Sequence, residues 1–89
     1  MNEPLKRSIS ESFRNTPMGF LRIKRNLGVI QFSDAETEAY LRGIILSTPL
    51  EDIEVKGKNY YFNCYKSNAI LTINSSTLTV ITAKKINKS

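Results

Sequence analysis

A change of hydrophobic period at Pro49 divides the 89-residue chain into two unlike parts. Before Pro49, apolar residues recur at the spacing of a helix that buries one side. After it, apolar and polar residues alternate in short runs separated by small polar turns, which is typical of hairpin-linked strands. We therefore predict an α+β fold, with two to three N-terminal helices packed on a three- to four-stranded antiparallel meander sheet.

The length predicts a single domain over residues 1–89, because a second core would be too small to be stable on its own. Within this domain we expect a helical part at 1–50, an antiparallel sheet at 51–85 and a frayed tail at 86–89. One thin core of helices on a sheet leaves little room for a deep substrate cavity.

The first two predicted helices are short. A four-residue apolar repeat that ends at Phe13 predicts a helix over 4–14. The next helix is expected to begin at Thr16, because threonine followed by proline is a favoured helix start, and to stop at Gly28. Gly19 lies inside it and costs roughly 1 kcal/mol relative to alanine, so this helix is expected to be short or kinked.

The third predicted helix has the clearest start. Ser33 and Glu36 have the spacing of a capping box, in which each side chain bonds to the backbone amide of the other. The acids that cluster there also favour the positive end of the helix dipole. We expect this helix to end before Pro49, because a residue that precedes proline avoids the helical conformation.

Four alternating runs are expected to form the strands, and the first turn between them contains Gly57. β-branched residues are frequent in the last two runs and suit a pleated surface. The predicted strands cover residues 52–55, 59–65, 69–73 and 77–83.

Lysine and arginine number 13 against 8 aspartate and glutamate residues, which gives a net charge of +5. Six of the cations precede residue 26, and the last lysines have no acid nearby. This basic excess favours a polyanion such as RNA, or an acidic protein surface, as the partner. Many inert small domains are equally basic, so charge alone does not decide between these alternatives.

The chain has no histidine and a single cysteine, Cys64. Neither a histidine base nor a cysteine cluster for zinc is available, and we expect no metal and no cofactor. A lone cysteine in an alternating strand is expected to be a small buried side chain in a reducing compartment. No apolar run approaches the ~20 residues that span a bilayer, so we expect a cytoplasmic protein without membrane contact.

Arg22, Arg25 and Asn26 share one face of the second predicted helix. Arginine binds phosphate through two parallel hydrogen bonds, and asparagine can contact a base edge or a ribose hydroxyl. The alternative is a solvated helix surface, or an arginine paired with the acids of the third helix, because charged runs usually face water.

The first hairpin combines Lys56, Lys58 and Asn59 with Tyr60 and Tyr61. Lysines beside stackable rings suit single-stranded nucleic acid, since the charge binds the backbone and the rings bind the bases. The alternative is an ordinary hairpin in which one tyrosine packs in the core and the other covers a sheet edge.

A threonine near a lysine at the end of the last strand could orient a scissile phosphate while the cation stabilises its charge. Without histidine, proton transfer would depend on arginine, lysine, tyrosine or a carboxylate, which is usually less efficient at neutral pH. The catalytic candidates are Arg22, Lys58, Thr82 and Lys84. The candidates for binding RNA or a protein partner are Arg22, Arg25, Asn26, Lys56, Lys58, Asn59, Tyr60, Tyr61, Lys84 and Lys85.

Three sequence blocks follow one another in this chain: Pro17-x-Gly19-x-x-Arg22-Ile23-x-Arg25-Asn26-Leu27, Gly57-Lys58-Asn59-Tyr60-Tyr61 and Thr72-Ile73-Asn74-Ser75-x-Thr77-x-Thr79-Val80-Ile81-Thr82-Ala83. Together they resemble an uncharacterised family of small bacterial and phage proteins, a domain of unknown function. The resemblance covers residues 17–85 and implies no activity. In the pattern of that family a histidine often follows the alanine of the last strand, where Lys84 stands here.

The order of the predicted elements also resembles the RelE and colicin D type of ribonuclease toxin, in architecture alone. That resemblance implies RNA cleavage by arginine, lysine, threonine and tyrosine side chains. It leaves open whether this chain is an enzyme. If it is one, the absence of histidine makes it a histidine-free ribonuclease.

Three hypotheses follow. The first, which the basic clusters and tyrosines favour, is a small basic nucleic-acid-interacting domain, toxin-like if it cleaves RNA. The second is a non-catalytic phage or mobile-element protein that binds and inhibits a host defence protein through an acidic patch. The third is a homodimer that buries an apolar patch to which Tyr40, Tyr61, Tyr65 or Ile70 would contribute.

Overall fold

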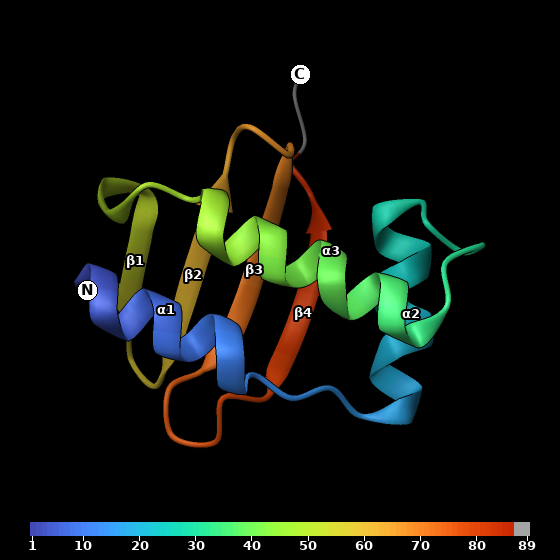
Figure 1. The fold of residues 1–89 in the computed structure, drawn as a ribbon, viewed down its shortest axis with the longest axis horizontal. Coiled ribbons are helices and arrows are strands. Elements are labelled where there is room, and N and C mark those ends of the chain that lie inside the picture. The colour runs from blue at the N-terminus through green and yellow to red at the C-terminus, as the bar shows by residue number, and fades with distance from the viewer. Residues whose placement is uncertain (87–89) are drawn as a thin grey trace.

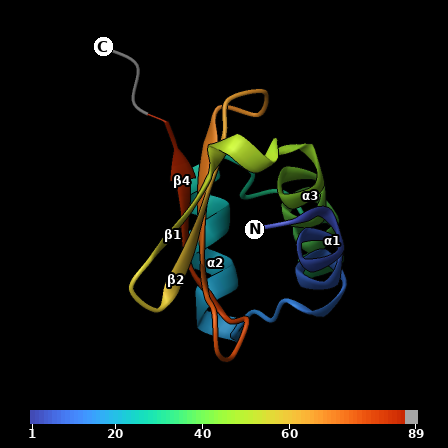
Figure 2. The same cartoon turned by 90° about the vertical axis from the view of Figure 1, so that its left-hand side faces the viewer.

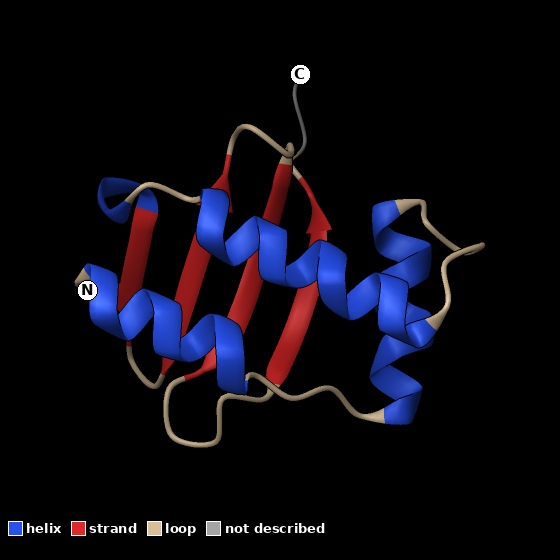
Figure 3. Ribbon diagram, in the orientation of Figure 1, coloured by secondary structure: helices blue, strands red, loops and turns tan. Residues whose placement is uncertain are grey.

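The computed structural model describes residues 1–86, which form three α-helices followed by a four-stranded antiparallel sheet (Figures 1 and 3). The strands follow one another in the sheet in chain order, so the predicted α+β meander is confirmed with four strands. The elements are α1 (Glu3–Ser12), α2 (Pro17–Leu27), α3 (Asp34–Ser47), a 3-10 turn η1 (Leu50–Asp52), β1 (Ile53–Lys56), β2 (Asn59–Cys64), β3 (Ala69–Asn74) and β4 (Val80–Lys85).

The helices are unevenly distributed about the sheet. Figure 2 shows α1 and α3 together on one side of it, and Figure 1 shows both crossing over the strands. Helix α2 lies beside β4, at the edge of the sheet. Among the described residues no helix covers the second face of the sheet, so that face is open to solvent or to a partner.

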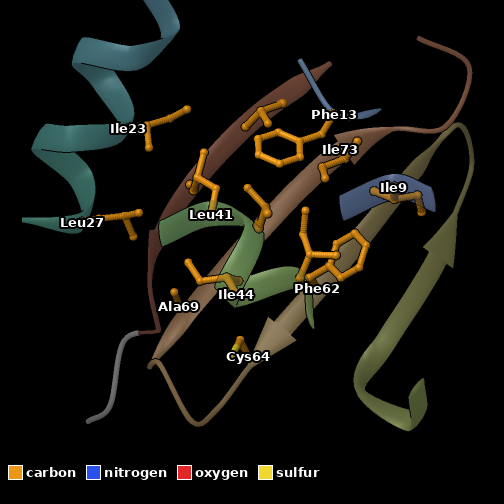
Figure 4. Close-up of a cluster of buried hydrophobic side chains, with 14 of the residues drawn as sticks. Ile9, Phe13, Ile23, Leu27, Leu41, Ile44, Phe62, Cys64, Ala69 and Ile73 are labelled. Atoms are coloured by element: carbon orange, nitrogen blue, oxygen red, sulfur yellow. The ribbon is translucent and has the colours of Figure 1, made fainter. Parts of the chain in front are cut away.

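The core lies between the sheet and the pair α1 and α3 (Figure 4). Phe62 of β2 is fully buried there, and Cys64 is buried as the sequence predicted. Ile23 and Leu27 of α2 join the same core from the β4 edge, which holds α2 beside the sheet. The other buried apolar side chains are Ile9, Phe13, Leu41, Ile44, Ile45, Ile53, Ala69, Leu71, Ile73, Val80 and Ala83.

Helix α2 and strand β4 run side by side in the same direction. At one end, Arg14 forms a parallel bridge with Thr79, just before both elements begin. At the other end, the Lys85 ammonium nitrogen would lie 3.3 Å from a Cβ placed on Gly28. The eleven residues of α2 rise about 16 Å, and the six residues of β4 span about 20 Å. The middle of α2, at Arg22, therefore lies level with the middle of β4.

The local signals for the helix ends are confirmed. Thr16 accepts a hydrogen bond from the Gly19 amide at 3.0 Å, and Ser33 and Glu36 form the capping box. Gly28 ends α2 with a φ of 73°, a left-handed conformation that strains any residue with a Cβ. The first helix ends at Ser12, two residues before the predicted boundary.

The last strand begins three residues later than predicted. The Asn74 carboxamide accepts hydrogen bonds from the amides of Ser76 and Thr77, which folds this segment into a loop that ends at Thr79. The predicted frayed tail begins at Ile86, whose amide donates to the Asn68 carbonyl at 2.9 Å. The rest of that tail, residues 87–89, lies outside the described residues.

Candidate functional site

The cross-strand register decides which side chains occupy the uncovered face of the sheet. Ile53, Phe62 and Leu71 form one row and are buried against the helices, so their sequence neighbours point the other way. We call the resulting surface the open face. Its three rows are Lys56, Asn59 and Asn74 at the turn end, then Glu54, Tyr61, Thr72 and Thr82, then Asn63, Ile70 and Lys84.

Tyr61 occupies the middle row of the open face and is half-buried. Its partner in the next strand, Thr72, is only 4% exposed although no helix covers it, so the side chains around it must cover it. The centre of the open face is therefore a packed surface on which an aromatic ring is partly exposed. Such a ring can stack against a planar ligand.

Glu54 is the carboxylate of this middle row, and it is engaged on both oxygens. Lys56 lies 3.0 Å from one oxygen, and the Asn63 carboxamide donates to the other at 3.0 Å. The hydrogen bond and the charge of Lys56, and then the bond from Asn63, hold the pKa of Glu54 below its usual value. A carboxylate that is stabilised in its ionised form is a weak proton acceptor.

Replacing Lys56 by methionine is expected to raise the pKa of Glu54 towards its usual value, because the largest stabilising contact is removed. With Lys56 present, the pKa of Glu54 is lower in the folded state than in the unfolded state. The contact therefore stabilises the fold at pH values above the usual pKa of glutamate. The contribution is lost as the pH falls through the folded-state value. The measurement is an NMR titration of the Glu54 carboxyl carbon.

The matched control for this titration is Lys58→Met, in the adjacent turn. Lys58 is exposed and forms no ion pair within residues 1–86, so its loss should leave the pKa of Glu54 unchanged. Equal titration curves for the two variants would contradict the assignment of the shift to Lys56.

A cleft of about 270 Å³ lies between α2 and β4, at the edge of the open face. A register shift after Thr72 inserts Ile81 as an extra residue into β4, so that Val80 and Ala83 both face the core. Ile81 is left 49% exposed and lines the cleft. The cleft is lined mainly by Thr16, Met18, Arg22, Ile23, Ile81 and Thr82.

The basic excess is partly structural. Lys6 is 6% exposed and donates to the Leu46 and Thr48 carbonyls at the end of α3, at 3.3 and 3.1 Å. Three further cations have partners within the described chain: Lys24 with Asp34, Arg42 with the Ser10 carbonyl and the Phe13 ring, and Lys56 with Glu54. The predicted pairing of an arginine of α2 with the acids of α3 is made by Lys24 instead.

Half of the remaining exposed cations lie on two neighbouring elements. Eight are exposed without an ion pair in residues 1–86: Arg7, Arg14, Arg22, Arg25, Lys58, Lys66, Lys84 and Lys85. Four of these eight belong to α2 or β4, and neither element contains an acidic residue. We call the surface formed by α2 and β4 the basic edge. Uncompensated positive charge of this kind favours an anionic ligand.

The structure brings together several of the residues predicted from the sequence. Arg22 and Thr82 line the same cleft, and Lys84 lies on the same side of β4 as Thr82. Tyr61 occupies the same row as Thr82. Three more predicted binding residues adjoin this group: Lys56 and Asn59 form the turn-end row of the open face, and Arg25 is exposed on α2.

Other predicted residues are separated from that group. Tyr60 is on the helix-covered side and packs against the core. Lys85 is opposite Ala69 on that same side and reaches towards Gly28. Asn26 is exposed on α2 but does not line the cleft.

The four predicted catalytic residues do not converge. Lys58 lies in the β1–β2 turn, and its carbonyl accepts from the Ser75 amide, beyond one end of β3. Lys84 pairs with Ile70 near the other end. The five residue steps from Ile70 to Ser75 correspond to about 17 Å along the strand direction. One phosphate could therefore contact Arg22, Thr82 or Lys84, but not Lys58 at the same time.

The residues named for a homodimer patch lie on both sides of the sheet. Tyr40 lies on α3 and packs edge-on against Phe32, with ring centroids 6.0 Å apart, in the helix layer. Ile70 and Tyr61 are on the opposite side of the sheet. These residues therefore do not form one continuous surface.

A family model described as "Protein of unknown function (DUF3781)" matches residues 7–84. The chain belongs to this family. The DUF3781 match agrees with the sequence resemblance in pointing to a domain of unknown function. No curated protein and no solved structure was found to match the chain.

The DUF3781 region includes Arg22, Tyr61, Thr82 and Lys84. Within residues 1–86, no three or more cysteine and acidic side chains are grouped so that they could hold a metal ion. In the same part of the chain, none of the helices combines the length and apolar character needed to cross a membrane.

Sequence reasoning missed the cleft of this DUF3781 chain. Met18 is 87% exposed and appeared in the sequence only as an ordinary residue of an amphipathic helix. Ile81 appeared as an ordinary strand residue, because a single sequence contains no signal that predicts a register shift. Thr16 was identified as a helix cap, but its position beside β4 depends on contacts between distant segments.

Proposed function

We propose that the chain binds single-stranded nucleic acid across the open face, with its phosphates on the basic edge. The observation that carries this proposal is the continuity of the two surfaces at Thr82, which lies in the row of Tyr61 and also lines the cleft with Arg22. An aromatic ring for stacking and a group of cations without ion pairs in residues 1–86 therefore lie on adjoining surfaces. Proteins that bind single strands combine the same two features.

The physical argument separates binding from cleavage. Antiparallel sheets with aromatic side chains on an uncovered face bind splayed-out bases by stacking, and exposed cations bind the backbone. Cleavage would also need a proton acceptor near the scissile bond. Glu54, the carboxylate of the middle row, has both oxygens engaged by Lys56 and Asn63 and lies on β1, at the opposite edge of the sheet from Thr82 and Lys84. We therefore propose a binding domain rather than a ribonuclease.

Replacing Arg22 by alanine is expected to weaken binding of a single-stranded oligonucleotide and to lower its salt dependence. One lost phosphate contact lowers the slope of log K against log salt by about 0.7 for a single strand. The measurement is fluorescence anisotropy of labelled oligouridine and oligothymidine across a salt series. A duplex of the same length should bind more weakly, because its bases are not free to stack on Tyr61.

The matched control is Arg7→Ala, since Arg7 is also exposed but lies on α1, on the other side of the sheet. Arg7→Ala should retain both the affinity and the salt slope. Equal losses in the two variants would show only a general charge effect and would contradict a site at the basic edge. Shortening of the oligonucleotide during the assay would instead establish a ribonuclease.

Absence of binding to any oligonucleotide would overturn the proposal. The basic edge would then be assigned to an acidic protein surface, as expected for an inhibitor of a host protein. Capture of partners by the wild-type chain but not by Arg22→Ala would be the next measurement.

A further inference from the structure

The cleft between α2 and β4 is not needed for stacking on Tyr61 or for simple phosphate contacts. Resting on the proposed function, we infer that this cleft receives one nucleobase that has left the stack, while a neighbouring base stacks on Tyr61. The cleft would then make binding depend on an accessible single strand and on the fit of one base.

The size of the cleft suits a single base with part of its sugar. Its volume of about 270 Å³ is below the roughly 300–1,000 Å³ of sites for drug-sized ligands. Ile23, Val80 and Ala83 contribute a buried apolar lining, while Met18 and Ile81 are largely exposed beside it. Methionine is flexible and polarisable, and its sulfur makes favourable contacts with aromatic rings. These groups can enclose the two faces of a planar ring.

Glycine at position 19 keeps the α2 side of the cleft free of a side chain. A Cβ at this position would lie 2.8 Å from the Thr16 hydroxyl oxygen, which accepts the Gly19 amide hydrogen as the cap of α2. Any larger residue would therefore disturb the cap and narrow the cleft. The requirement for glycine here explains why α2 carries a residue that is unfavourable in a helix.

Polar groups lie where the edge of a base would reach them. The Thr16 oxygen accepts from Gly19, but its own hydrogen remains available to a ligand. Thr82 adds a hydroxyl that can donate or accept, and Arg22 adds a cation for the attached phosphate. A partly apolar cleft with a few convergent polar groups and one cation is matched in chemistry by a nucleotide.

Tyr61 lies two inter-strand spacings from Thr82 at the edge of the cleft, so one bound strand can reach both. Tyr61 and Thr82 lie on β2 and β4, with β3 between them, which corresponds to about 10 Å across the sheet. The bound strand would thus run across the β-strands, from the centre of the open face to the basic edge. Lys84 lies along this edge, one alternate position beyond Thr82.

The test uses oligonucleotides in which a single 2-aminopurine is moved from position to position. A base inside the apolar cleft is unstacked and should brighten, and its neighbour on Tyr61 should be quenched. Ile81→Phe fills the cleft from an exposed position in the register shift, which the fold can accommodate. It should abolish the brightening and weaken binding about tenfold, the value of one lost base contact.

The matched control is Val55→Phe, which adds the same ring at another exposed strand position, 57% exposed, on the far edge of the sheet. It should preserve both the brightening and the affinity. Binding that depends on Tyr61 but is unaffected by Ile81→Phe would overturn the cleft inference and leave the proposed function standing. No binding of any oligonucleotide would overturn both.

Discussion

Replacing Lys6 by methionine is expected to destabilise the fold by about 2 kcal/mol, because a buried carbonyl (Thr48) and a part-buried one (Leu46) at the end of α3 lose their donor. Each unsatisfied buried group costs about 1–3 kcal/mol, and the lost interaction with the helix dipole adds about 0.3–1 kcal/mol. The variant also no longer has the desolvation penalty of a buried Lys6 ammonium group, which offsets part of this loss of stability. In a domain of this length, about 2 kcal/mol corresponds to a fall in Tm of roughly 8–16 °C.

The measurement is urea unfolding followed by circular dichroism, with Arg7→Met as the matched control. Arg7 is the next residue on α1 and is exposed, so its replacement should change the free energy of unfolding by less than about 0.5 kcal/mol. If the urea midpoint of Lys6→Met equals that of Arg7→Met, the Lys6 ammonium group makes no net contribution to stability.

Lys6 also illustrates the limit of counting charges in a sequence. It was one of the six cations that made the first part of the chain look like a polyanion-binding surface. In the fold it holds α1 against the end of α3. Charge runs are visible in a sequence, but burial depends on which distant segment packs over them.

The helix ends could be predicted because their signals are local. Thr16, Gly28 and the capping box at Ser33 each act within three or four residues along the chain. The alternation of β2 and β3 was equally readable, since a strand keeps its period over its own length. These signals were sufficient for the α+β class and the order of the elements.

The candidate site was only partly predictable because it depends on contacts between distant segments. The sequence indicated that one tyrosine of the pair would pack in the core, but only the placement of α3 decides that this is Tyr60. The start of β4 was misplaced because the Asn74 carboxamide forms a turn. The Arg14–Thr79 bridge beside α2 and the register shift at Ile81 both join segments that are distant in the sequence.

Replacing Tyr61 by leucine is expected to weaken binding of single-stranded nucleic acid by about 5- to 150-fold, because stacking of one base on an aromatic ring contributes about 1–3 kcal/mol. Leucine keeps an apolar side chain beside Thr72, so the packing of the open face should change little. The measurement is a titration by anisotropy at fixed salt, with the unfolding midpoint of each variant measured in parallel.

Tyr61→Phe is the conservative partner of this variant, because it keeps the ring and removes only the hydroxyl. It should bind within about threefold of the wild-type chain if stacking is the dominant contact. A large loss in Tyr61→Phe would instead assign the interaction to the hydroxyl. Full binding by Tyr61→Leu, with Arg22→Ala still impaired, would place the nucleic acid on the basic edge alone. The open face would then have no part in binding, because Tyr61 is the ring of its middle row.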